Sequence, residues 1–81
     1  MSRPMKQRNY IREAGAECAS LLTEGYVMKV HHYDDKNKTA YSTLQHTTNG
    51  NIIHINATPA GYCITKNGTI VKHVKQTVHQ S

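Results

Sequence analysis

The sequence predicts an α+β domain, in which an N-terminal helix packs on one face of an antiparallel β-meander of about five strands. Two observations lead to this prediction. The spacing of apolar residues changes from a helical period of about 3.6 before Gly25 to a strand period of about 2 after it. The predicted strands are also joined by short turns, and short links favour antiparallel pairing of neighbouring strands.

The predicted helix covers residues 9–24 and begins at Asn9, whose side chain can accept hydrogen bonds from the first free backbone N–H groups. Glu13, Glu17 and Glu24 fall on one side of this helix. The opposite side carries an apolar stripe at helical spacing, formed by Ile11, Ala14, Cys18, Leu21 and Leu22. The middle of the stripe is small, so we expect the helix to lie close to the sheet. Gly25 supplies the left-handed residue that ends the helix.

Five segments after Gly25 have the alternating pattern of half-buried strands, residues 26–33, 39–47, 51–58, 61–66 and 69–76. In the first segment, alternation places two sets of side chains on opposite faces, Tyr26, Met28 and Val30 against Val27, Lys29 and His31. In the third, it groups Ile53, Ile55 and Ala57 on one face. A helix lying across one face of this sheet would cover the apolar set.

The connections are the most specific signals in the chain. Asn49-Gly50 and Asn67-Gly68 predict two-residue type I′ hairpin turns, because both central residues of that turn need a positive φ. Residues 58–61 (TPAG) predict a short Pro/Gly turn, and residues 34–38 (DDKNK) a polar hairpin loop. The chain therefore divides into a flexible basic arm (1–8), a single α+β domain (9–76) and a polar tail (77–81).

The composition points to a small basic protein. The 81 residues include ten Lys/Arg and five Asp/Glu, a net charge of +5. This balance favours polyanionic partners, although many small proteins carry such a charge for solubility alone. Neither Trp nor Phe is present, so the core is thin and no cofactor pocket is expected. With no apolar membrane segment, no signal peptide and no CxxC pattern, we expect a cytoplasmic protein with reduced thiols and no membrane partner.

Residues 30–38 (VHHYDDKNK) allow three interpretations: a metal site, an active site, or a polar strand end that runs into a turn. His31 and His32 are expected on opposite faces of a strand, so they cannot share one ion without ligands from other strands. Asp34 and Asp35 begin the predicted loop, where a carboxylate accepts hydrogen bonds from backbone N–H groups. None of the six histidines lies at a zinc-binding spacing, and we predict no metal site and no catalytic residue.

A metal-free ribonuclease is the enzymatic alternative. It requires a histidine acid or base and a cation near one phosphate. Depending on strand register, His31, His54 and His73 share the outer sheet face with Lys29, Lys72 or Lys75.

Residues 11–55 also resemble HicA-type ribonuclease toxins and the double-stranded-RNA-binding fold that they share. The likeness lies in a helix, a Gly-aromatic step and three strands, as in LLTEGYVMKVHHY and YSTLQHTTNGNIIHI. The resemblance implies that the protein cleaves RNA. The toxin's Gly-Ser-His segment is replaced here by NKTAYST, and its closing helix by two predicted strands, so no catalytic histidine is assigned.

Binding without catalysis is the function that we predict. The candidate binding residues are Arg3, Lys6, Arg8, Arg12, Lys29, His31, His54, Lys72, His73 and Lys75. The polar sheet face, which also carries Tyr41, Thr43, Gln45 and Asn56, is either a platform for RNA or an ordinary solvent-exposed face.

In size and style the chain is similar to the small inhibitors that phages and mobile elements encode, anti-CRISPR proteins among them. This likeness implies that the partner is a host protein or an RNA–protein complex. Direct RNA or DNA binding is the alternative. The edge strands of the meander allow either a monomer or a homodimer through an edge strand.

Overall fold

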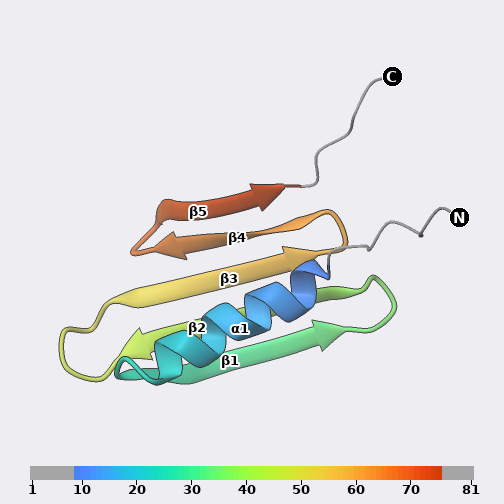
Figure 1. Ribbon diagram of the computed structural model, residues 1–81. Coiled ribbons are helices and arrows are strands. Elements are labelled where there is room, and N and C mark those ends of the chain that lie inside the picture. The colour runs from blue at the N-terminus through green and yellow to red at the C-terminus, as the bar shows by residue number, and fades with distance from the viewer. Residues whose placement is uncertain (1–8, 76–81) are drawn as a thin grey trace, which may run out of the picture.

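The computed structural model describes residues 9–75, which form one helix and five strands in the predicted order (Figure 1). The elements are α1 (Tyr10–Leu22), β1 (Tyr26–Asp34), β2 (Thr39–His46), β3 (Ile52–Thr58), β4 (Gly61–Lys66) and β5 (Thr69–Lys75). The strands form one antiparallel sheet in the order β1-β2-β3-β4-β5, which confirms the predicted meander. The predicted arm (1–8) and tail (77–81) lie outside the described residues.

Helix α1 begins as predicted, because the Asn9 side chain accepts a hydrogen bond from the backbone N–H of Arg12 at 3.0 Å. It ends at Leu22, two residues before the predicted boundary, with Thr23 as the C-cap. Gly25 has a φ of +96°, and a Cβ at this position would lie 2.8 Å from the His46 ring. Both facts favour glycine at the step from helix to strand.

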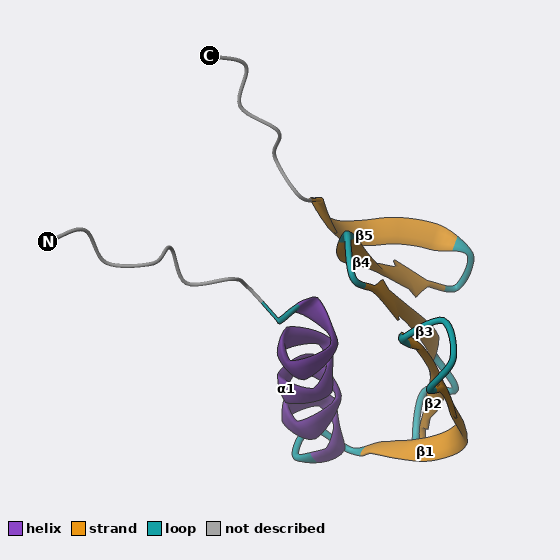
Figure 2. Ribbon diagram, turned by 90° about the vertical axis from the view of Figure 1, so that its right-hand side faces the viewer, coloured by secondary structure: helices purple, strands orange, loops and turns teal. Residues whose placement is uncertain are grey.

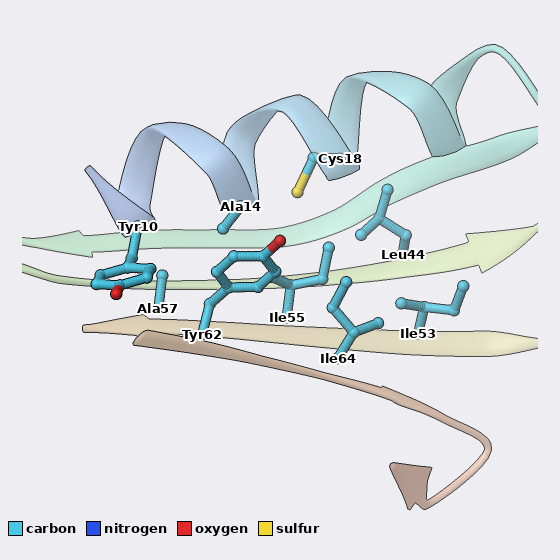
Figure 3. Close-up of a cluster of buried hydrophobic side chains, with 9 residues drawn as sticks. All are labelled: Tyr10, Ala14, Cys18, Leu44, Ile53, Ile55, Ala57, Tyr62 and Ile64. Atoms are coloured by element: carbon cyan, nitrogen blue, oxygen red, sulfur yellow. The ribbon is translucent and has the colours of Figure 1, made fainter. Parts of the chain in front are cut away.

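The core lies between α1 and the sheet face that α1 covers (Figure 3). Its buried side chains are Tyr10, Ala14, Cys18, Leu44, Ile53, Ile55, Ala57, Tyr62 and Ile64. Tyr10 was missed by the predicted stripe, which began one residue later. Leu22 was included in the stripe, but it is 47% exposed because the helix ends there.

The predicted faces of β1 are wrong beyond Lys29. Met28 pairs with Leu44 and Val30 pairs with Thr43, so Lys29 is the extra residue of a β-bulge. The extra residue reverses the alternation that follows it. Val30 therefore lies on the face away from the helix, whereas His31 faces the helix.

The two predicted type I′ turns have different outcomes. Asn67 and Gly68 both have a positive φ (+51° and +87°), as this turn requires. At Asn49-Gly50 the prediction is wrong, because only Gly50 has a positive φ and residues 47–51 all lie between the strands. This longer loop is closed by the His46 N–H, which donates to the Asn51 carbonyl at 2.8 Å.

Candidate functional site

The candidate site is the sheet face opposite α1, which we call the outer face (Figure 2). No described element covers it. Two neighbouring rows of side chains run across the strands of this face. By register they are His32, Tyr41, Asn56, Cys63 and His73 in one row, and Val30, Thr43, His54, Thr65 and Ile70 in the other.

The centre of the outer face is held by a hydrogen-bonded network of three side chains. The Tyr41 hydroxyl lies 2.8 Å from Nδ1 of His54, and the Thr43 hydroxyl donates to the Tyr41 hydroxyl at 2.9 Å. Thr43 also lies 3.0 Å from the same His54 nitrogen. The Tyr41 and His54 rings are stacked, with centroids 5.9 Å apart and an interplanar angle of 19°. All three side chains are half-buried and are already held in place by these hydrogen bonds. The binding of a partner would therefore cost little further side-chain entropy.

The charge on this face is one-sided. All five acidic residues lie at or before Asp35, three of them in the helical region and two at the β1–β2 loop. Strands β2 to β5 therefore carry no carboxylate side chain. The absence of acidic residues after Asp35 is visible in the sequence, but the net charge of the whole chain conceals it.

The predicted binding residues are divided between the two sides of the molecule. His54, His73 and Lys75 lie on the outer face, and Lys29 lines a shallow hollow there with Val27 and Gln45. Arg12 is exposed on α1. His31 and Lys72 lie on the helix side. Arg3, Lys6 and Arg8 lie outside the described residues.

Lys72 forms an ion pair with Glu17 of α1. Its Nζ also lies 5.8 Å from the centre of the Tyr62 ring, and the Tyr62 hydroxyl donates to the same Glu17 carboxylate at 3.2 Å. The hydrogen bond to Glu17, followed by the contact with Tyr62, raises the pKa of Lys72 above its usual value. In this position, Lys72 connects β5 to the helix and faces away from the outer face.

His31 lines an open apolar groove of about 410 Å³ between α1 and strands β1 to β3. Its Nδ1 is 3.0 Å from the hydroxyl of the buried Ser42. Burial raises the pKa of the neighbouring Cys18 thiol; the Glu17 charge adds to this effect, and the Ser42 hydrogen bond opposes it. A thiol held in its protonated form is a poor nucleophile, and within residues 9–75 no carboxylate orients the His31 ring. The groove also shows that the small residues of α1 do not bring the helix close to this part of the sheet.

Within residues 9–75, no group of three or more His, Cys, Asp or Glu side chains could hold a metal ion. The single described helix is also too short and too polar to cross a membrane. Comparison of the chain with protein-family models, with curated proteins and with solved structures finds no match. The fold and the candidate site thus define an α+β domain in which a helix covers one face of a meander and leaves the other face open.

Proposed function

We propose that this protein is a non-enzymatic binding protein that docks its outer face on a nucleoprotein or nucleic-acid-handling complex of a host. In this respect it would act like the small inhibitors of phages and mobile elements. The observation that carries the proposal is the open outer face of β2 to β5, which has no carboxylate and is ordered by its own hydrogen bonds.

Such a face suits an anionic partner for two reasons. First, contact between two negative groups costs free energy when both lose water. Strands β2 to β5 carry no negative side chain, so an anionic partner that docks on them avoids this cost. The face also offers hydroxyl, amide and imidazole groups for hydrogen bonds, with Lys29 at one side and Lys75 at another. Steering by lysines and short-range hydrogen bonding together favour specific docking.

The arrangement of the histidines favours binding over RNA cleavage. The three histidines on the outer face are His32 on β1, His54 on β3 and His73 on β5, so another strand lies between the strands of each successive pair. Neighbouring strands are about 4.8 Å apart, so the backbones of each pair are separated by about 10 Å. An acid and a base must both reach one phosphodiester group within hydrogen-bond distance. His31 lies on the opposite face, together with Lys72.

Direct binding of single-stranded nucleic acid is the second candidate, and the stacked Tyr41 and His54 rings favour it. An aromatic side chain on an open sheet can stack on a base, which contributes about 1–3 kcal/mol per base. The neighbouring Asn56 offers an amide to a base edge.

A pull-down from a bacterial lysate, with and without nuclease, tests the proposal. The full chain should recover a defined protein complex that survives nuclease treatment. Asn56→Glu places a carboxylate on the outer face and should abolish recovery, whereas the matched control Ala16→Glu adds the same charge to the exposed side of α1 and should not. Recovery of nucleic acid alone would establish direct binding instead. Equal recovery by Asn56→Glu would exclude the outer face as the interface.

An assay with labelled RNA tests the enzymatic alternative. We expect no turnover in the absence of added metal. Turnover that is lost in His54→Ala and retained in His31→Ala would replace the binding proposal with a ribonuclease acting on the outer face. His31→Ala is the control because His31 lies on the helix side of the sheet.

A further inference from the structure

Strand β1 is an edge of the sheet and the longest strand, with nine residues. Among the described residues, three of the seven large hydrophobic side chains that remain exposed belong to it: Val27, Val30 and Tyr33. An edge strand presents unpaired backbone N–H and C=O groups, and exposed apolar side chains beside them favour pairing with another strand.

The other edge, β5, also exposes two large hydrophobic side chains, Ile70 and Val71, but the segment that follows them is protected by its charges. After the bulge in its pairing with β4, β5 continues with Lys72, His73 and Lys75. Two copies of that segment would bring like charges together. The corresponding segment of β1, Val30–Asp34, follows the bulge at Lys29 and contains no lysine or arginine. Self-pairing is therefore favoured at β1 over β5.

The space beside β1 is also incompletely filled. Helix α1 crosses the sheet obliquely, with its C-terminal end over the start of β1 and its N-terminal end towards β3 (Figure 1). The second half of β1 is left next to the apolar groove, which His31 and Tyr33 help to line. Tyr33 is 44% exposed there. A partner at this edge would cover both the backbone and the side of the groove.

We propose that the partner is a second copy of this chain, and that β1 pairs with the β1 of that copy in antiparallel orientation around a two-fold axis at His32. The regular segment Val30–Asp34 is bounded by the bulge and by the strand end, and a two-fold axis must map this segment onto itself. Its midpoint is His32. Val30 then lies opposite the partner's Asp34, and His31 lies opposite the partner's Tyr33.

Charge complementarity supports this register. Lys29 comes near the partner's Asp35, an exposed carboxylate that also pairs with Lys38 of its own chain, and symmetry repeats this contact at the other end of the segment. The two five-stranded sheets become one continuous sheet, with both outer faces on the same side. Because only a short segment pairs, the interface is small, and we expect a weak dimer with a dissociation constant on the order of micromolar. This inference does not depend on the proposed docking partner.

Sedimentation velocity of the full chain, from about 5 to about 500 µM, tests the dimer. The wild-type chain should change from monomer to dimer over this range. Val30→Asp faces the partner's Asp34 and should raise the dissociation constant roughly tenfold, since the like-charge contact occurs twice. Val30→Lys places a positive charge opposite the same carboxylate and should not raise the dissociation constant. Ile70→Asp, a similarly exposed position on β5, is the control for an unspecific effect of the new charge.

Disulfide trapping tests the register. At the two-fold axis the paired Cα atoms lie about 4.5–5.5 Å apart, within the range that a disulfide can bridge. In a Cys63→Ser background, His32→Cys should form a cross-linked dimer on oxidation, and Val71→Cys on β5 should not. A chain that stays monomeric at the highest concentration, or that cross-links through Val71→Cys and not His32→Cys, would overturn the proposal. Circular dichroism establishes that each variant is folded.

Discussion

At the scale of single residues, two glycines differ in the space available for a side chain. A Cβ at Gly61 would lie 2.1 Å from the Val74 carbonyl oxygen of the neighbouring strand, and φ at Gly61 is +154°. Gly15 of α1 is exposed beside the apolar groove, and a Cβ at this position meets no atom within 4 Å. The same substitution should therefore have opposite effects at the two positions.

Gly61→Ala should lower the free energy of unfolding by about 2 kcal/mol or more, because β4 and β5 must separate to admit the methyl group. Gly15→Ala should raise it by about 0.5–1 kcal/mol, because alanine loses less backbone entropy in a helix. Urea denaturation monitored by circular dichroism measures both changes. Equal stabilities for the two variants would contradict the close contact between Gly61 and β5.

Asp34 shows how the polar loop is built. Its carboxylate accepts hydrogen bonds from the Asn37 side chain at 2.7 Å and from the backbone N–H groups of Lys36 and Asn37. The Asn37 side chain is the largest of the causes that lower the pKa of Asp34 below its ordinary value of 3.8; the backbone bonds and the nearby His32 also contribute. This is the role expected for a carboxylate at the start of a polar loop.

The pH dependence follows from the direction of that shift. Because the folded state has the lower pKa, the contribution of Asp34 to stability is complete above the unfolded pKa and is lost as pH falls through the folded one. NMR titration of the Asp34 carboxyl carbon should give a lower pKa in the folded chain than in concentrated urea. Asn37→Ala should raise the folded value towards 3.8. An unchanged pKa in this variant would show that Asn37 is not the main cause.

At the scale of elements, the bulge in β1 decides which side chains reach which face. Because Met28 and Val30 already pair with the adjacent residues Leu44 and Thr43, deletion of Lys29 should leave every other pair between β1 and β2 in place. We expect this variant to fold, with a change in stability of about 1 kcal/mol or less.

The control is deletion of Thr43, which lies in β2 between two strands. This deletion moves part of β2 to the wrong face and should prevent stable folding. Hydrogen exchange measured by NMR would compare the two chains. Loss of protection throughout the sheet after deletion of Lys29 would show that the bulge is required for the fold.

At the scale of the whole molecule, the distribution of charge sets the proposed function. The acidic side chains lie in the helical region and at the β1–β2 loop, and the rest of the sheet has only neutral and basic ones. One of these acidic side chains, Glu17, forms an ion pair with Lys72 and so connects β5 to the helix. On strands β2 to β5 the outer face carries no carboxylate, which makes this part of it the surface best suited to an anionic partner.

The sequence by itself determined the helix, the five strands and their antiparallel order. These depend on local periodicity, on the Asn9 cap and on short links, all of which act between residues close in the chain. It also determined that His31 and His32 point to opposite faces, because neighbouring residues in a strand do so.

Only the tertiary structure decided which histidine faces the helix and which lysine is held by Glu17. The bulge at Lys29 depends on pairing with a strand distant in sequence, and much of β1 is exposed on both faces, so its apolar pattern does not reveal the change. The Asn49-Gly50 turn was mispredicted because residues 47–51 form a longer loop, in which His46 Nδ1 accepts hydrogen bonds from the backbone N–H groups of Thr48 and Asn49. The arrangement of side chains on each face of this sheet therefore depends on register, which is a property of strand pairs and not of single segments.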